Sequence, residues 1–304
     1  MVKSKKLDVH ILCAAAVSVL STSVVYLPKT DDKSPVLAMV LALILGLPIY
    51  ILFVKTQNKI NIKSDMVKKL FAIGISLFII YLAAKSFAST LDYFSSAVLT
   101  KTPAWLILLP FFALVLYAAV CGGDVVKKFT ILGFILVALL IIILMLVSFK
   151  NLDIKLITAP KFDTAFFKTV AKYFVIVFVF SSEVLIFQKK GGEDKDFLKS
   201  TTFGVLIGGA LLTVAVANSV LSFGENYSAK LDFPYSYAIS TFSVGNLFTR
   251  LDGFAYLIIL TLNFLKGALC ILSCEYLLSP FKIALRKTLL FILCLLSLLL
   301  SFLL

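Results

Sequence analysis

The chain has 304 residues, of which 61 % are hydrophobic and 15 % charged, and its mean hydropathy is +1.06. This composition excludes a soluble globular protein and indicates a helical protein that crosses a membrane several times. The net charge of +13 does not indicate nucleic-acid binding, because the lysines lie mostly in loops between apolar stretches, where they report membrane topology.

The residue types that build metal and redox sites are sparse. There is one histidine, and the five cysteines lie in or beside apolar stretches without C-x-x-C spacing. We therefore expect no metal and no cofactor, and we interpret the cysteines as small packing residues. The sequence shows no nucleophile–base pair, so we do not expect an enzyme.

Nine apolar stretches follow one another and predict a single transmembrane domain over residues 1–304. The first could pass for a signal peptide when taken alone, but the spans after it favour a first transmembrane helix. We expect the spans at 9–27, 35–54, 67–97, 103–120, 129–149, 173–187, 202–223, 254–278 and 285–304. The bias of Lys and Arg among the loops favours a cytoplasmic N-terminus, although the loop 150–172 places lysines on the other side.

A carboxylate interrupts the sixth span, in the sequence Phe180-Ser181-Ser182-Glu183. At the helical rise it lies roughly 15 Å into the bilayer. A charge there is costly, so it normally faces a cavity or a partner, and the two serines can satisfy backbone groups where a helix loosens. We interpret the stretch as a broken helix that lines a small-molecule site. The alternative is a structural Glu that bonds to a neighbouring helix.

The first span carries four hydroxyl residues near its middle: Ser18, Ser21, Thr22 and Ser23. They suggest a second loosened helix. The alternative is that these side chains bond back to the preceding turn of a regular helix, which is common in membranes.

Further polar residues lie inside the third and eighth spans. Tyr81 and Lys85 share a face of the third span with Asp92, and Asn263 and Lys266 lie in the eighth. Lys85, Glu183 and Lys266 fall at similar depth. Such an arrangement is what an inverted repeat produces, here 9–149 and an incomplete 165–304, with a site where the halves meet.

Several short stretches together carry a resemblance to a known family. They are Phe180-Ser181-Ser182-Glu183, Leu231-Asp232-Phe233-Pro234, 245–252, Phe264-Leu265-Lys266 and, more loosely, Tyr26-Leu27-Pro28, Leu99-Thr100-Lys101-Thr102-Pro103 and 117–124. In this order and spacing the chain resembles the spore germination permeases, the B subunits of nutrient germinant receptors, which are relatives of the amino acid–polyamine–organocation transporters.

The resemblance implies an all-α polytopic membrane protein with a LeuT-like inverted-repeat bundle, in the inner membrane of a bacterial spore. It implies a small germinant, often an amino acid, and assembly with an A and a C subunit. The family has ten spans whereas this chain has about nine, so we expect the last helix of the second repeat to be missing. Asp252 also stands where the family usually has Glu.

We expect the ligand site where the first, third, sixth and eighth spans converge, since loosened helices expose backbone groups that suit a zwitterion. The candidate ligand-binding residues are Ser21, Thr22, Ser23, Tyr81, Lys85, Phe180, Ser181, Ser182, Glu183, Asn263 and Lys266. A germinant receptor subunit and a secondary amino acid transporter both need such a site, and a purely structural membrane subunit is a third possibility.

Lys85, Glu183 and Lys266 sum to one positive charge if all are ionised, which is expensive at the bilayer centre. Either one lysine is neutral through burial, or a ligand carboxylate completes the set. In the second case a fixed ammonium takes the place of a coupling cation and binding needs no sodium. The competing interpretation is that Glu183 pairs with one lysine to hold helices together while the other lysine reaches water.

The polar segment 224–250 separates the seventh and eighth spans. Tyr235, Ile239 and Phe242 stand at helical spacing in it. We expect a short amphipathic helix within 230–248 that caps the external vestibule, with Tyr235, Tyr237 and Phe242 packed on the bundle. The alternative is a solvated loop tip.

Overall fold

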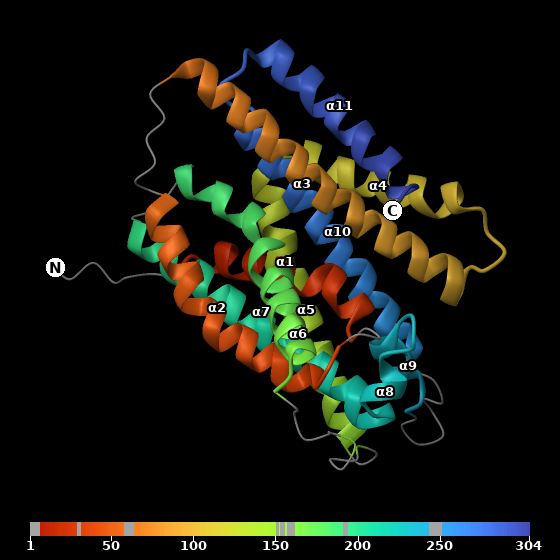
Figure 1. Cartoon of the computed structure of the whole chain (residues 1–304). Helices are drawn as coiled ribbons and strands as arrows, with labels where there is room; N and C mark the ends of the chain where they lie inside the picture. Colours follow the sequence, from red (N-terminus) through yellow and green to blue (C-terminus); the bar gives the residue numbers. More distant parts are fainter. Residues whose placement is uncertain are drawn as a thin grey trace.

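The computed structural model describes residues 7–28, 32–57, 64–149, 152, 156, 162–190, 194–242 and 251–304. Within these ranges the chain is helical and has no strand (Figure 1). Eight helices are long and apolar enough to cross a membrane, and a ninth apolar helix is shorter. The predicted all-α bundle of about nine spans is therefore confirmed.

The elements follow one another in the order expected from hydropathy. They are α1 (Val9–Tyr26), α2 (Pro35–Gln57), α3 (Asp65–Tyr93) with η1 (Phe94–Val98), α4 (Ala104–Val120), α5 (Gly123–Ser148), α6 (Thr164–Phe174) with η4 (Val175–Val179) and η5 (Ser182–Lys190), α7 (Asp194–Phe223), α8 (Glu225–Ser228), α9 (Pro234–Ser240), α10 (Asp252–Leu277) and α11 (Ile283–Ser301). Several helices begin earlier than predicted. The sixth begins at Thr164 because the Asp163 side chain caps it, accepting from Phe166 N at 2.8 Å.

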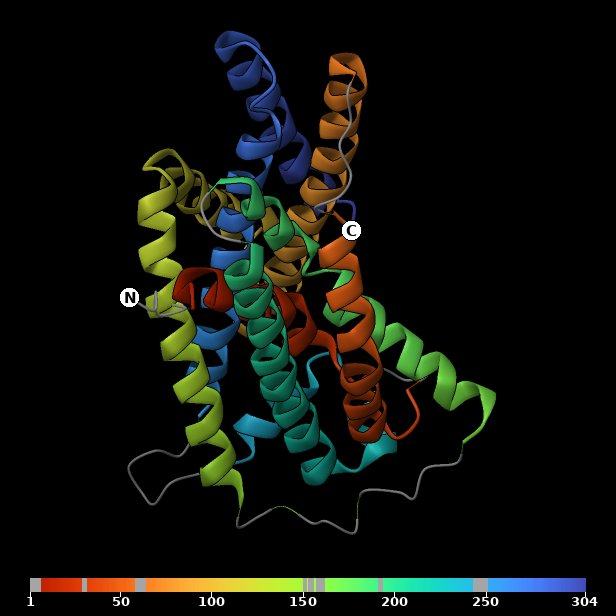
Figure 2. The same ribbon diagram turned by 90° about the vertical axis from the view of Figure 1, so that its left-hand side faces the viewer.

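The centre of the bundle is α1, which lies against α7, α10 and α5 (Figure 2). Of its residues, 82 % are buried, against 17 % in the span of α11. Two glycines allow α7 to approach it closely. A Cβ on Gly204 would lie 2.3 Å from the carbonyl oxygen of Leu12, and one on Gly208 would lie 2.8 Å from that of Ala16. Small residues four positions apart thus bring the two backbones together, as is common between membrane helices.

The expected loosening of the first helix is wrong. α1 is one continuous α-helix, begun by the Asp8 side chain, which accepts from the amides of His10 and Ile11. The hydroxyl of Ser21 donates back to the carbonyl of Ser18 at 3.5 Å. The alternative of hydroxyls that bond to the preceding turn therefore fits α1 better, because such bonds need no break in the helix.

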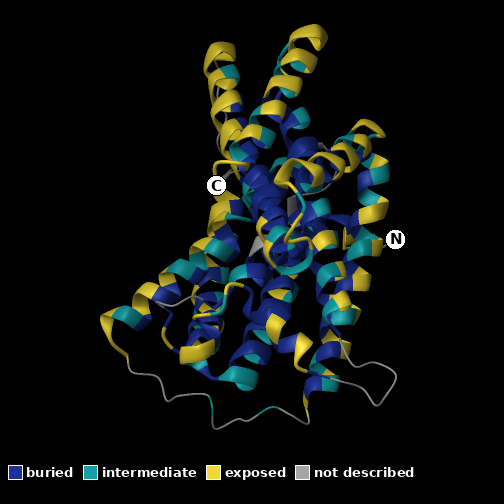
Figure 3. Cartoon of the chain, turned by 90° about the vertical axis from the view of Figure 1, so that its right-hand side faces the viewer, coloured by how far each residue is buried: buried dark blue, intermediate teal, exposed yellow. Residues whose placement is uncertain are grey.

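At one end of the bundle two helices extend past the others. There α11 and the first half of α3 project side by side beyond the other helices (Figure 2). Most of their outer residues are exposed, whereas the middle of the bundle is buried (Figure 3). Apolar side chains on a spanning helix face lipid without cost, so this surface suits a bilayer.

The opposite end is covered by α8 and α9. The predicted short helix is confirmed as α9, in which Tyr235 and Ile239 are buried, followed by buried Phe242. Burial raises the pKa of Tyr235 above its ordinary value. Tyr237 differs from the prediction, since it is 39 % exposed and does not pack into the bundle. Residues 243–248 of the predicted segment lie outside the described residues.

Candidate functional site

The sixth span is broken where the sequence predicted. After α6 the chain forms one π-helical turn, η4, then turns at Phe180 and Ser181 and continues as the 3₁₀ helix η5. The hydroxyl of Ser181 donates to the carbonyls of Val177 at 2.7 Å and Phe178 at 3.3 Å. These bonds satisfy backbone acceptors that the π-turn and the turn after it leave without their regular partners.

A buried ion pair joins this break to α10. Lys266 forms a salt bridge with Glu183, and both side chains are almost completely buried. The same ammonium donates to the carbonyl of Phe180 at 2.5 Å and to that of Ser18 in α1 at 3.4 Å. Lys266 thus holds α1, α10 and the broken span together, and its charge is offset by one carboxylate and two carbonyl dipoles.

Three buried oxygen atoms of this region make no hydrogen bond within the described part of the chain. They are Oε2 of Glu183, Oγ of Ser18 and the hydroxyl of Tyr50. Tyr50 also packs its ring on Phe178, with the centroids 5.5 Å apart, so its hydroxyl comes from α2 toward the broken span. The interior around the break therefore contains oxygen atoms that can form hydrogen bonds in addition to those of the ion pair.

A second buried polar contact joins α3 and α10. The amide of Asn263 donates to Ser89 Oγ at 3.0 Å, while Ser86 Oγ donates to the backbone carbonyl of Asn263 at 3.0 Å. All three side chains are buried. They fix the two helices against each other one turn from Lys266.

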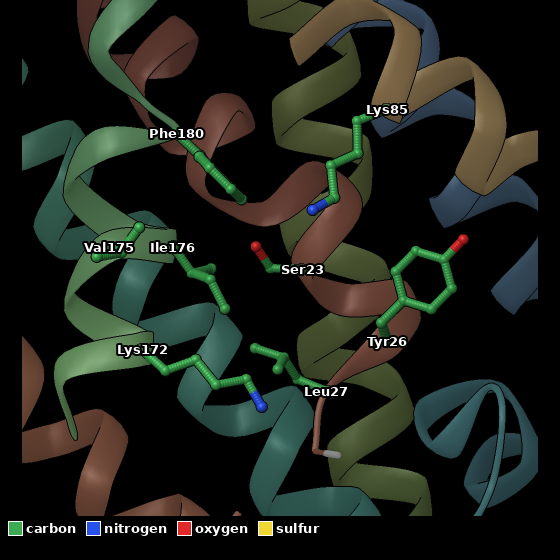
Figure 4. Close-up of a pocket in the computed structure, with 8 residues that line it drawn as sticks. All are labelled: Ser23, Tyr26, Leu27, Lys85, Lys172, Val175, Ile176 and Phe180. Carbon is green, nitrogen blue, oxygen red and sulfur yellow. The ribbon is translucent and has the colours of Figure 1, made fainter. Parts of the chain in front are cut away.

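A cavity of about 350 Å³ lies beside the break, between α1, α3 and the sixth span (Figure 4). We call it the α6 cavity. Its lining residues are Ser23, Tyr26, Leu27, Lys85, Lys172, Val175, Ile176 and Phe180. The side chains of Lys85 and Phe180 converge on it, and the Lys85 ammonium lies 5.0 Å from the centroid of the Phe180 ring. A cation over an aromatic face is favourable at this distance.

Lys172, which lines the α6 cavity, forms a salt bridge with Asp32. Its ammonium donates to Oδ1 of Asp32 at 2.5 Å, and the hydroxyl of Tyr173 donates to Oδ2 at 2.8 Å. The Asp32 side chain is buried, whereas that of Lys172 is 34 % exposed. This pair ties the start of α2 to α6.

A neighbouring cavity of about 500 Å³ lies at the loop between α8 and α9. We call it the α9 cavity. Its lining residues are Tyr26, Asp92, Ser95, Ser96, Ala229, Lys230, Leu231, Asp232 and Phe233. Tyr26 lines both cavities, and its hydroxyl donates to Asp92 Oδ2 at 2.8 Å. The Tyr26 side chain therefore separates a largely apolar space from a polar one.

Comparison with known proteins identifies the family to which the chain belongs. The chain matches the family profile described as spore germination protein, Spore_permease, over residues 11–304. It belongs to the spore germination permease family. The resemblance seen in the sequence is thereby confirmed, and the chain is an integral membrane, permease-like protein. A search of curated proteins returned no match.

Two solved structures show which fold this spore permease has. One is a substrate-bound, outward-open Na⁺-coupled sialic acid symporter, with a TM-score of 0.64, 12 % identity and coverage of 97 % of this chain and 72 % of that chain. The other is Mhp1, a nucleobase-cation-symport-1 family transporter in a closed conformation with bromovinylhydantoin bound, with a TM-score of 0.64, 14 % identity and coverage of 97 % and 71 %. They confirm the LeuT-like bundle. Because the sequence identity is low, the similarity shows the fold and does not extend to function.

Of the predicted site residues of the permease, Ser23, Lys85 and Phe180 line the α6 cavity. Other predicted residues are used in packing around it: Ser21, Ser181, Glu183, Asn263 and Lys266. Ser182 is half-buried in the break. Tyr81 is 36 % exposed and does not line the cavity, and the side chain of Thr22 lies outside the described residues.

Five lining residues were not predicted: Tyr26, Leu27, Lys172, Val175 and Ile176. Lys172 and Ile176 stand eight and four residues before Phe180, so they share its helical face. That spacing was a usable signal. Leu27 offers none, because an apolar residue at the end of a span looks the same whether it faces a cavity, lipid or protein.

Proposed function

We propose that this spore permease is the membrane subunit of a spore nutrient germinant receptor and binds a small germinant, an amino acid, in the α6 cavity. Family membership over residues 11–304 is the observation that carries the proposal. The cavity supports it, since about 350 Å³ falls within the range of small-molecule sites and a mostly apolar wall with a few polar groups is typical of them.

The position of the cavity suggests how binding is transmitted. Its wall includes Phe180, whose carbonyl is held by Lys266. A ligand that contacts the Phe180 ring therefore acts on the same residue that joins the break to α10 and α1. If the germinant binds one arrangement of the break more tightly, it shifts the population toward that arrangement.

The wider setting belongs to the same proposal. The receptor subunit resides in the inner membrane of the spore, with its N-terminus cytoplasmic, and assembles with an A and a C subunit. The Lys and Arg bias of the loops supports this orientation. The chain acts as one transmembrane domain of two repeats, 9–149 and 165–304.

A secondary amino acid transporter is the alternative. Both matched structures are transporters by their descriptions, which favours a fold able to move a ligand across a membrane. The two functions differ in one observable. A transporter accumulates labelled amino acid in proteoliposomes, whereas a receptor subunit binds it without net uptake.

The test is to fill the cavity in spores that depend on this chain. Ser23→Leu adds bulk to the lining, and we expect the amino acid concentration for half-maximal germination to rise at least tenfold while the membrane level of the protein is unchanged. Thr288→Leu is the matched control, because Thr288 is an exposed residue of α11 whose hydroxyl donates to the carbonyl of Ala284 in its own helix. An unchanged germination response in the Ser23→Leu spores would refute the proposal.

A further inference from the structure

Basic residues gather where α3 begins and where α10 turns into α11. The two segments 64–71 and 275–288, which we call the basic end, contain five basic and two acidic residues, an excess of three positive charges. α3 and α11 pack against each other, and their starts project beyond the other helices (Figure 2). The excess positive charge is therefore presented away from the rest of the bundle.

The basic end contains two salt bridges. Lys69 lies 2.7 Å from Asp65, and Arg286 lies 3.8 Å from Glu275. The other three basic residues are exposed lysines that form no salt bridge with the described part of the chain: Lys68, Lys282 and Lys287. An anion can approach all three from outside.

Large apolar side chains stand between these lysines. Met66 is 82 % exposed, Leu70 71 % and Ile283 68 % (Figure 3). A cluster of exposed apolar residues is unfavourable in water. At the edge of a bilayer, such residues enter the hydrocarbon while long lysine side chains extend to the headgroups. The mixture of lysine and apolar residues within two helical turns therefore indicates a surface at the membrane interface.

The length of α3 places its first turns at headgroup depth. The helical stretch Asp65–Val98 has 34 residues, which is about 50 Å at the helical rise, whereas the hydrocarbon core of a bilayer is about 30 Å thick. Even a tilt of about 40° leaves this stretch longer than the core. Since the first half of α3 is the part that projects from the bundle, the extra length lies at its start (Figure 2).

We propose that the basic end is a docking site for anionic phospholipids. The phosphate of the headgroup binds Lys68, Lys282 and Lys287, and the acyl chains lie along the exposed apolar faces of α3 and α11. A lipid matches both properties of this surface, whereas a free phosphate matches the charge and leaves the apolar side chains uncovered. The docking site does not depend on which ligand the α6 cavity binds.

The test compares three probes on the full chain purified in a neutral detergent. They are phosphatidylglycerol, which is anionic, phosphatidylcholine, which is neutral overall, and glycerol phosphate, an anion without acyl chains. Binding is measured as the rise in unfolding temperature with probe concentration. We expect an apparent affinity for phosphatidylglycerol at least tenfold higher than for phosphatidylcholine, and no stabilisation by glycerol phosphate. Equal affinities for the two lipids would overturn the inference, and so would glycerol phosphate that stabilises as well as phosphatidylglycerol.

Variants locate the site. Lys68→Gln/Lys282→Gln/Lys287→Gln removes the three exposed lysines of the basic end. We expect this variant to bind phosphatidylglycerol at least tenfold more weakly, because basic side chains near an anionic lipid surface each add to the attraction. The corresponding triple variant with Arg keeps the charges and should hold the affinity within about threefold. Wild-type affinity in the Gln variant would overturn the inference.

The control variant loses the same charge elsewhere. Lys33→Gln/Lys101→Gln/Lys168→Gln removes exposed lysines that lie before α2, after η1 and in the first turns of α6, away from the basic end. We expect its affinity for phosphatidylglycerol to stay within about threefold of wild type. An equal loss of affinity in both Gln variants would mean that net charge, and not the basic end, attracts the lipid.

Discussion

The ammonium of Lys266 donates to the carbonyl oxygen of Phe180 at 2.5 Å, across 86 positions of the sequence. It also forms a salt bridge with Glu183, which stands just past the turn of the sixth span. A backbone acceptor freed by a helix break in a membrane costs several kcal/mol unless it is satisfied. The lysine satisfies this acceptor and the carboxylate together, so the break and the ion pair depend on each other.

Loss of one partner of this pair should destabilise the protein strongly. Lys266→Met leaves Glu183 buried without its counter-charge and the Phe180 carbonyl without its donor, so we expect a loss of about 3–5 kcal/mol of stability. The measurement is thermal unfolding of the purified protein together with its level in the membrane.

The double variant Glu183→Gln/Lys266→Met provides the control. Without either charge, it should recover much of what Lys266→Met loses, because the isolated buried carboxylate is gone. A Lys266→Met protein as stable as wild type, or a double variant no more stable than Lys266→Met alone, would contradict this account.

Ligand binding should not depend on sodium. The position between the carbonyls of Ser18 and Phe180 is held by the Lys266 ammonium, which already supplies a cation at the junction of α1 and the break. We expect equal Kd values for the bound amino acid in sodium chloride and in choline chloride at the same ionic strength. Binding that tightens more than threefold with sodium would show that a cation acts elsewhere.

The course of the helices was largely predictable, whereas their exact ends were not. Apolar stretches identify spans because every backbone group in a bilayer must be bonded within a helix. The predicted fifth span began at 129, yet α5 begins at Gly123. The helix includes Lys127 and Lys128, which come before the apolar stretch and which hydropathy therefore leaves out. The hydroxyls of α1 predicted a break that is absent, since serines can bond to their own helix without distorting it.

The site was predictable in its chemistry more than in its geometry. A carboxylate and two serines in the sixth span pointed to a break, and the break is present. Depth alone could not say which lysine meets Glu183. Lys266 does, whereas Lys85 faces the α6 cavity, because helix rotation and not sequence depth decides which side chains meet.

The close packing of α1 on α7 should be sensitive to one methyl group. Gly204→Ala places a Cβ 2.3 Å from the carbonyl oxygen of Leu12, so the helices must separate, and we expect a loss of about 1–3 kcal/mol. Gly74→Ala in α3 is the matched control, because no atom lies within 4 Å of the added Cβ. Thermal unfolding should show the first variant destabilised and the second unchanged or slightly more stable. Equal unfolding temperatures for both variants would mean that α1 and α7 are not in such close contact.

The hydrogen bond from Tyr26 to Asp92 should slow exchange of ligand between the two cavities. Tyr26 lines both of them, and its ring also lies against Phe233, with the centroids 6.3 Å apart. Tyr26→Phe keeps the ring and removes the hydroxyl. The loss of its hydrogen bond to Asp92 should destabilise the position of the ring between the two cavities by about 0.5–1.5 kcal/mol. We therefore expect the bound amino acid to dissociate about 2- to 10-fold faster, measured by dilution of labelled amino acid from the purified protein. Tyr237→Phe is the control, since Tyr237 is exposed and lines neither cavity. If Tyr26→Phe releases ligand no faster than Tyr237→Phe, the Tyr26 side chain does not act as a barrier, and the ligand reaches the α6 cavity by another route.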